Sequence, residues 1–196
     1  MGTTGRAVVD LDVNALITDL RRAMLMELQT FYSLWITAIV AEGFHGEELT
    51  EHFKADALEE LGHAEKLATR ILELGGNPVV DPGEWAAGTG TPWIAPRKNF
   101  ADADGMVADQ IRAEAAAINH YNAIAKMTFG KDPVTYHLAT ELLADEVGHE
   151  EFLENLLGPR GAKNRGHRAR PTRKAAAAAK AAAAGKTASA ATRRKR

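Results

Sequence analysis

The sequence predicts an all-α protein whose main domain is a four-helix bundle. Four long segments repeat apolar residues at a helical period, and no segment shows the alternation of a half-buried strand. A long irregular stretch separates the second helical segment from the third. Two helical hairpins joined by a crossover account for all of these features, and four-helix bundles with such a long connection are a known architecture.

The first hairpin consists of two long helices joined by a short turn. Its first helix is predicted at about 14–42 and its second at about 47–74, with the turn at Gly43–Gly46 between them. The second helix stops at Gly75-Gly76, because glycine commonly ends helices. The residues before this hairpin, 1–13, are expected to form a flexible leader.

The second hairpin follows a proline- and glycine-rich stretch at 75–103 that is long enough to cross the whole bundle. The third helix is predicted at about 104–129. Asp132 is a typical N-cap residue and Pro133 favours the first helical position, so the fourth helix is expected to begin there. It runs to about residue 157, which places the bundle domain at 14–158.

Two Glu-x-x-His stretches carry the candidate chemistry: Glu60-Leu61-Gly62-His63 and Glu146-Val147-Gly148-His149. Residues three apart share one face of a helix, so each stretch can point a carboxylate and an imidazole at the same place. Glu27 and Glu114 lie among apolar residues on the other two helices. A third Glu-x-x-His, at 42–45, falls at a helix end and is not expected to contribute.

The spacing of these residues places them at one level of the bundle. Glu27 and Glu60 are equally far from the first turn, and Glu114 and Glu146 are equally far from the second. Docking the two hairpins would therefore bring four carboxylates and two imidazoles together. Because burying such groups without a partner is costly, a pair of divalent cations is predicted at the centre. The predicted ligands are Glu27, Glu60, His63, Glu114, Glu146 and His149.

Charge is divided sharply along the chain. Residues 159–196 contain 13 Lys and Arg and no Asp or Glu, whereas residues 1–158 have a net charge of −15. The basic segment is of low complexity, so a disordered tail is predicted, and its cations suit non-specific binding to the phosphates of DNA. A solubilising tail, or one that folds back on the acidic body, is the alternative.

The absence of cysteine excludes disulfides and iron–sulfur clusters. With no secretory leader or apolar run of membrane-spanning length, a soluble protein without a membrane partner is expected.

Residues 14–157 resemble the ferritin-like superfamily, close to bacterioferritins and to Dps-like ferritins with a bacterioferritin-type di-iron centre. The resemblance rests on the six residues above, and Tyr121 also fits the pattern. It implies terminal ligands at Glu27 and Glu114, bridging carboxylates at Glu60 and Glu146, and one metal-binding imidazole each at His63 and His149. It also implies two irons per subunit and oxidation of Fe²⁺ by O₂ or H₂O₂, with storage of iron in a hollow homo-oligomer.

Three departures refine these expectations. Leu61 stands where bacterioferritins have the haem-binding methionine, so no haem is expected. Gly158-Pro159 leads into the tail in place of a fifth helix, which favours a 12-subunit shell over one of 24. Ordinary Dps proteins bind iron between subunits through a histidine of the first helix, and residues 14–42 contain none. The metal site is therefore expected within one subunit.

The leading hypothesis is a ferroxidase that stores iron, binds DNA and is located in the cytoplasm on the nucleoid. One alternative is a nucleoid-compacting structural protein with a non-catalytic metal site. Another is a di-metal oxidoreductase without storage, similar to manganese catalase. Iron uptake beyond two ions per chain would separate the first hypothesis from the last.

Overall fold

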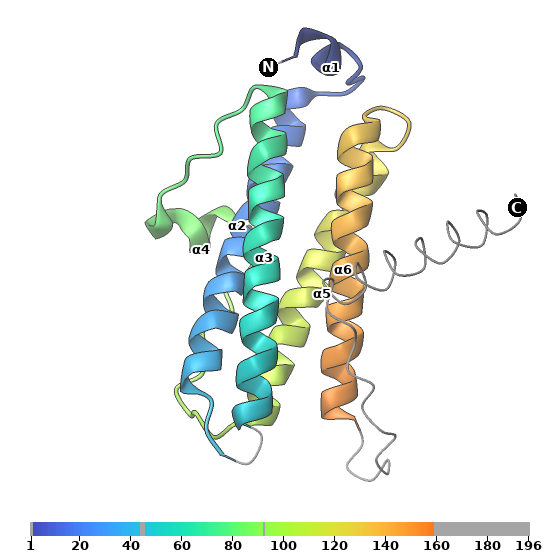
Figure 1. Ribbon diagram of the computed structural model, residues 1–196. Helices are drawn as coiled ribbons and strands as arrows, with labels where there is room; N and C mark the ends of the chain where they lie inside the picture. Colours follow the sequence, from blue (N-terminus) through green and yellow to red (C-terminus); the bar gives the residue numbers. More distant parts are fainter. Residues whose placement is uncertain (1, 44–45, 92, 159–196) are drawn as a thin grey trace, which may run out of the picture. The chain divides into compact units, whose positions relative to one another are not determined.

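The computed structural model describes residues 2–43, 46–91 and 93–158. Four long helices form the bundle: α2 (Val13–Val40), α3 (Gly46–Leu74), α5 (Ala103–Thr128) and α6 (Pro133–Leu157) (Figure 1). The described part of the chain contains no strand, and the predicted all-α bundle is confirmed. The predicted tail, and two residues of the third Glu-x-x-His, lie outside the described residues.

Aspartate side chains cap three of the four long helices at their N-termini. Asp12 accepts hydrogen bonds from the backbone at the start of α2, and Asp102 does so at the start of α5. Asp132 accepts from the backbone N–H groups of Val134 and Thr135, as its position before Pro133 predicts. These caps fix where each helix begins. The first bundle helix ends two residues earlier than predicted, because Ala41 is already extended.

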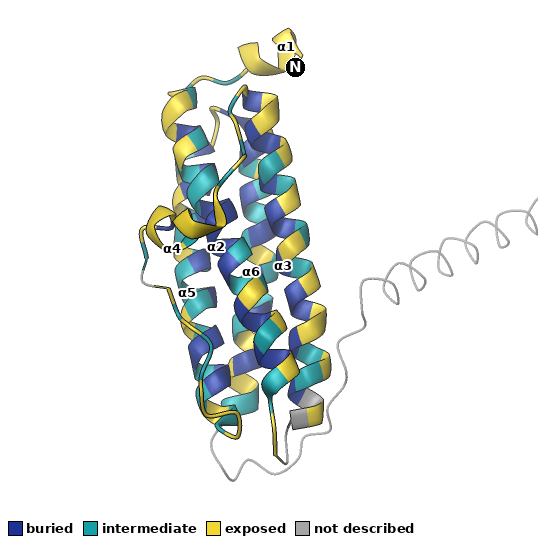
Figure 2. Cartoon of the chain, turned by 90° about the vertical axis from the view of Figure 1, so that its left-hand side faces the viewer, coloured by how far each residue is buried: buried dark blue, intermediate teal, exposed yellow. Residues whose placement is uncertain are grey.

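Apolar side chains fill the bundle in two clusters, one on each side of a polar layer. The larger cluster includes Leu20, Leu67 and Ile124, and the smaller one includes Phe53 and Leu153. Figure 2 shows the buried residues as a stripe along the inner face of each helix. The residue numbers of the two clusters leave a gap at the same level on all four helices, and the candidate metal ligands occupy it.

The crossover between α3 and α5 runs the length of the bundle and includes a 3₁₀ turn, η1 (Pro82–Glu84), and a short helix, α4 (Trp85–Gly88) (Figure 1). Two arginines hold it to the bundle. Arg21 of α2 donates hydrogen bonds to backbone oxygens at its start, and Arg97 near its end donates to Asp109 of α5. The crossover therefore packs along α2 and α5 and covers that side of the bundle.

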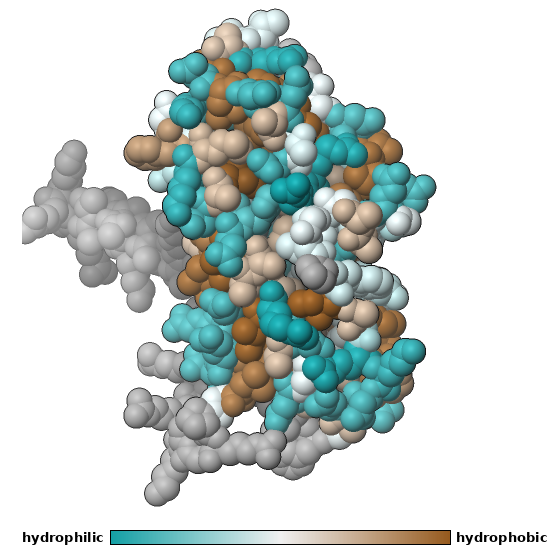
Figure 3. Space-filling view, turned by 180° about the vertical axis from the view of Figure 1, so that it is seen from behind, coloured by the Kyte–Doolittle hydropathy of each residue, from teal (hydrophilic) through white to brown (hydrophobic). Residues whose placement is uncertain are grey.

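The remaining features of the fold are the N-terminal segment, the apolar character of α2 and the surface. A short helix that was not predicted, α1 (Thr3–Ala7), stands at the N-terminus with all its residues exposed. By length and composition alone α2 is apolar enough to cross a membrane, but its buried side packs in the core and includes Glu27. Hydrophobic patches lie among hydrophilic side chains on the face seen in Figure 3.

Candidate metal centre

The six predicted ligands meet in the middle of the bundle. Each lies on the buried side of its helix, and none exposes more than 4% of its surface. They come from all four long helices: Glu27 from α2, Glu60 and His63 from α3, Glu114 from α5, Glu146 and His149 from α6. The equal distances from the two turns, which follow from the sequence alone, thus correspond to one level in space.

Two groups of four ligand atoms overlap in this layer. Glu27, Glu60, His63 and Glu146 form one group, and Glu60, Glu114, Glu146 and His149 form the other. In each group the ligand atoms lie within 4.8 Å of one another. Glu60 and Glu146 belong to both groups, which is the position of a carboxylate that bridges two cations.

The distances around the two imidazoles are nearly symmetrical. His63 Nδ1 lies 3.2 Å from a Glu60 oxygen and 3.0 Å from a Glu146 oxygen. His149 Nδ1 lies 3.3 Å from Glu60 and 3.2 Å from Glu146. The ring centroids are 6.3 Å apart. Both histidines therefore present Nδ1, and not Nε2, to the shared carboxylates.

Burial and mutual repulsion govern the protonation of the centre. Burial, reinforced by the charges of Glu60 and Glu146, raises the pKa of Glu27 well above its usual value, and the pKa of Glu114 is raised in the same way. Burial alone would lower the pKa of His63, but the neighbouring carboxylates of Glu146, Glu27 and Glu60 outweigh it and raise that pKa to about 12. The metal-free centre therefore contains protons that cations would have to displace.

Two carboxylate oxygens show that the residues fit bound cations. Glu60 Oε1 and Glu146 Oε1 are buried and accept no well-aligned hydrogen bond, although they lie 3.3 Å from His149 Nδ1 and 3.0 Å from His63 Nδ1. A buried acceptor without a donor carries a desolvation cost of about 1–3 kcal/mol, and more when it is charged. Coordination to a cation would satisfy both oxygens. Carboxylate and imidazole ligands without thiolate suit Fe²⁺ or Mn²⁺, with Zn²⁺ as a competitor.

Two further carboxylates, which the sequence analysis did not single out, face the outer nitrogens of the histidines. Asp145 of α6 lies 3.5 Å from His63 Nε2 of α3, and Glu59 of α3 lies 3.7 Å from His149 Nε2 of α6. Each residue immediately precedes a shared glutamate in the sequence. The arrangement is crossed between the two helices, and such carboxylates commonly orient metal-binding histidines. The repeated acidic pair before each x-x-His was a signal for them.

Tyr121 completes the wall of the centre. It is fully buried on α5, and its hydroxyl donates a hydrogen bond to Glu27 Oε1 on α2. Burial, reinforced by the neighbouring carboxyl groups of the centre, raises the pKa of this phenol, so it remains a neutral donor. The hydrogen bond holds one oxygen of Glu27 and leaves the other free to face His63 and the shared carboxylates.

The remaining histidines that are described lie away from the centre. His52 pairs with Asp56 at 2.9 Å and packs against Phe152. The ring of His120 lies 2.9 Å from the backbone oxygen of Asp19. His137 is exposed. None of these three belongs to a group of potential metal ligands in the part of the chain that the structure describes.

Comparison with known proteins decides the family. Residues 17–160 match the family model of the ferritin-like domain. The chain belongs to the ferritin-like family. The four-helix bundle described above, with its layer of carboxylates and imidazoles between two apolar clusters, is therefore a ferritin-like fold.

The relatives of this chain include both a DNA protection during starvation (Dps) protein and bacterioferritins. The chain is 34% identical over 149 residues to the DNA protection during starvation protein of Pyrococcus furiosus, with coverage of 75% of this chain and 79% of that protein. It is 30% identical over 139 residues to a bacterioferritin of Desulfovibrio desulfuricans, with coverage of 70% and 71%. Among solved structures, the bacterioferritin-related protein of Bacteroides fragilis, described as a dodecameric thioferritin, is similar with a TM-score of 0.72. That protein is 35% identical, with coverage of 76% of this chain and 87% of its own.

Proposed function

We propose that this ferritin-like protein binds two iron ions per chain at its centre, oxidises Fe²⁺ to Fe³⁺ and stores the product. The observation that supports this most directly is the pair of overlapping ligand groups that share Glu60 and Glu146. Two cations placed there would be close enough to act on one oxidant molecule. Relatives named bacterioferritin and DNA protection during starvation protein support the same function.

The residues of the centre have separable roles in this reaction. Glu60 and Glu146 would hold both cations, while each side adds one carboxylate and one imidazole. With Fe²⁺ as substrate, two ferrous ions give two electrons to the oxidant. If H₂O₂ is the oxidant, its O–O bond breaks, two protons are taken up and two waters form. The protons displaced from the histidines and from Glu27 and Glu114 on Fe²⁺ binding are available nearby.

A double variant tests the assignment. Glu60→Gln with Glu146→Gln removes both shared carboxylates and should abolish tight binding of Fe²⁺, measured by anaerobic titration, and rapid oxidation after addition of O₂ or H₂O₂. Glu65→Gln with Glu151→Gln is the matched control, because it removes two exposed carboxylates from the same two helices. Oxidation at the parental rate in the first variant would show that the centre is elsewhere.

The same titration separates storage from a two-metal oxidoreductase. A storage protein continues to accept iron after about two ions per chain have been bound and oxidised, whereas an oxidoreductase similar to manganese catalase does not. The solved relative from Bacteroides fragilis is described as dodecameric. We propose a homo-oligomeric shell of 12 subunits for this chain, which sedimentation velocity would distinguish from 24.

We also propose that residues 159–196 bind DNA without sequence preference. The 13 Lys and Arg of this segment, and its lack of Asp and Glu, support the proposal. Many copies on one shell would bind together, which raises avidity. Accordingly, we place the protein in the cytoplasm, on the nucleoid. A chain ending at Gly158 should lose DNA binding in a gel-shift assay at low salt and retain iron oxidation. Undiminished DNA binding by the truncated chain would refute this proposal.

A further inference from the structure

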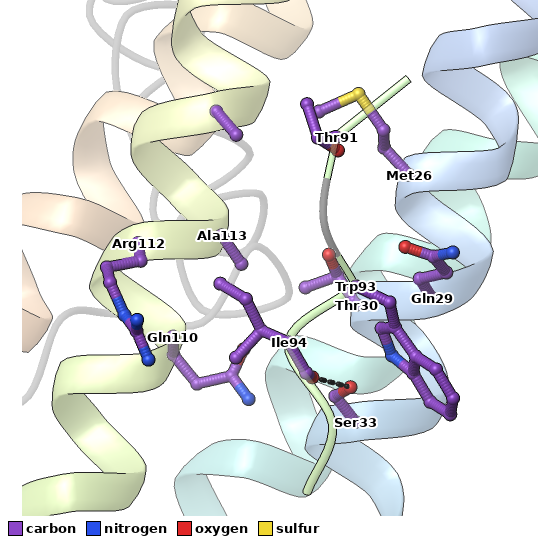
Figure 4. Close-up of a pocket in the computed structure, with 11 residues that line it drawn as sticks. Met26, Gln29, Thr30, Ser33, Thr91, Trp93, Ile94, Gln110, Arg112 and Ala113 are labelled. Atoms are coloured by element: carbon purple, nitrogen blue, oxygen red, sulfur yellow. Dashed lines mark hydrogen bonds between the residues drawn. The ribbon is translucent and has the colours of Figure 1, made fainter. Parts of the chain in front are cut away.

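A cavity of about 300 Å³ lies on the side of the bundle that the crossover covers. Figure 4 shows it between α2, α5 and crossover residues near Ile94. Its lining is largely apolar or neutral and includes Met26, Ile94 and Ala113. Arg112 is the one charged residue among the described lining residues, and it is a cation. The cavity offers no carboxylate to a metal ion, so it does not suit the passage of Fe²⁺.

Two glutamines in the cavity wall have unpaired polar atoms. The side-chain nitrogen of Gln29 and the side-chain oxygen of Gln110 are buried and have no hydrogen-bond partner. The two residues expose only 9% and 4% of their surfaces. Exchanging nitrogen and oxygen within either carboxamide would leave the same need, because each group both donates and accepts. The cavity therefore favours a small neutral molecule that can donate and accept hydrogen bonds.

Two residues that line the cavity are the chain neighbours of two candidate ligands of the centre. Met26 precedes Glu27 on α2, and Ala113 precedes Glu114 on α5. Gln110 lies one turn before Glu114 on the same face of α5, since residues four apart are neighbours on a helix. The two helices that border the cavity are thus the same two that each contribute a single carboxylate to the centre.

The other side of the centre has the opposite character. Glu59 and Asp145, on α3 and α6, are partly exposed there and face the outer nitrogens of the two histidines. This acidic side attracts cations, whereas the cavity on the α2 and α5 side is neutral apart from Arg112. The two reactants of an iron oxidation differ in the same way, since one is a dication and the other is a small neutral molecule.

We propose that the cavity binds hydrogen peroxide and admits it to the centre, while Fe²⁺ arrives from the side of Glu59 and Asp145. This inference rests on the proposed iron oxidation. H₂O₂ donates two hydrogen bonds and accepts others, so it can satisfy the amides of Gln29 and Gln110. Dioxygen forms no comparable hydrogen bonds, and a hydrated cation would lose its water without gaining a carboxylate. The cavity has room for several molecules of the size of water or peroxide.

The chain offers a direct measurement of binding, because Gln29 and Gln110 are its only glutamines. In metal-free protein labelled with ¹⁵N at glutamine side chains, the signals of two amide groups should shift together and saturably as H₂O₂ is added. Side-chain signals of asparagines, labelled separately, serve as the control. Glutamine signals that do not respond, or that shift no more than those of exposed Asn119, would overturn the proposal.

Kinetics of two variants of the full chain test the route. Gln29→Leu with Gln110→Leu keeps the side-chain volume but removes the polar atoms, and Ala113→Leu fills the cavity. Both should slow oxidation of Fe²⁺ by H₂O₂ about tenfold, the first by the loss of about 1.4 kcal/mol of hydrogen bonding and the second by occupying the space that peroxide would fill. Oxidation by O₂ and binding of Co²⁺ should remain at parental values. Asn119→Leu, which removes an exposed amide from α5, should change neither rate.

The outcomes separate this inference from the proposed function. A parent chain that oxidises Fe²⁺ with neither oxidant would refute the iron oxidation itself, and this inference with it. A parent that oxidises Fe²⁺ with peroxide at the same rate as both variants would overturn only the cavity. Equal slowing with O₂ and H₂O₂, or a parallel loss of Co²⁺ binding, would also overturn it, since the effect would then lie at the centre.

Discussion

The crossed carboxylates beside the centre lead to a quantitative prediction. Asp145 lies 3.5 Å from His63 Nε2, and its side chain is 20% exposed. At that distance, the attraction between a carboxylate and a full positive charge is about 5 kcal/mol at an effective dielectric constant of 20. A metal-bound neutral imidazole carries only part of that charge, so a smaller effect is expected. Loss of such an orienting carboxylate typically weakens metal binding by about 10–100-fold, or about 1.4–2.7 kcal/mol.

Asp145→Asn should therefore lower the affinity for Co²⁺ by about 10–100-fold, measured by titration of the visible absorption of bound Co²⁺. Glu59→Gln should have a smaller effect, because the Glu59 side chain is 36% exposed and lies 3.7 Å from His149. Glu141→Gln is the matched control, since Glu141 pairs with Lys66 across the same two helices at 2.9 Å. Affinity within twofold of the parent in Asp145→Asn, or an equal loss in the control, would refute the reasoning.

Three further predictions concern protons and stability. Because the pKa values of the two histidines and of Glu27 and Glu114 are raised, saturation with Co²⁺ should release about two to four protons per chain, measured in a pH-stat, and affinity should rise with pH. Since the pKa of His63 is about 12 in the folded chain against 6.5 normally, its stabilisation of the metal-free fold is full below pH 6.5 and declines toward pH 12. Urea unfolding of the metal-free chain should show lower stability at pH 9 than at pH 7. Asp132→Ala should lower the free energy of unfolding by about 3–5 kcal/mol, because it removes the buried counter-ion of Arg70 and leaves this buried arginine only the exposed Glu73 as an ionic partner. Asp12→Ala should cost about 1 kcal/mol, since it removes only an exposed cap. Equal losses in these two variants would contradict the role of the buried pair.

The level at which the ligands meet was predictable because the rise of a helix is constant. Two residues equally far from a tight turn must lie at the same height in an antiparallel hairpin. This reasoning places Glu27 beside Glu60 and Glu114 beside Glu146 without any knowledge of side-chain packing. The helix ends were predictable for a similarly local reason, since Asp132 and Pro133 determine the start of α6 through their own chemistry.

Contacts between helices that are distant in the sequence were not predictable in the same way. Glu59 follows the pattern of a solvent-facing residue on its own helix, and only the neighbouring α6 shows that it faces His149. The cavity depends on where the irregular crossover places Ile94 against α5, which no helical period determines. The hydrogen bond from Tyr121 to Glu27 likewise depends on the docking of the two hairpins.

Protons explain how this bundle can fold around its polar layer before metal arrives. The four carboxylates of this layer would repel one another in an apolar core if all of them were charged. The raised pKa values of Glu27 and Glu114 favour the neutral form of these two carboxyls, while the imidazoles, also with raised pKa values, favour positive charge beside Glu60 and Glu146. Divalent cations would replace these protons in the same positions. The apolar clusters on both sides can therefore hold the ligands in place in either state, so that metal binding does not require the bundle to refold.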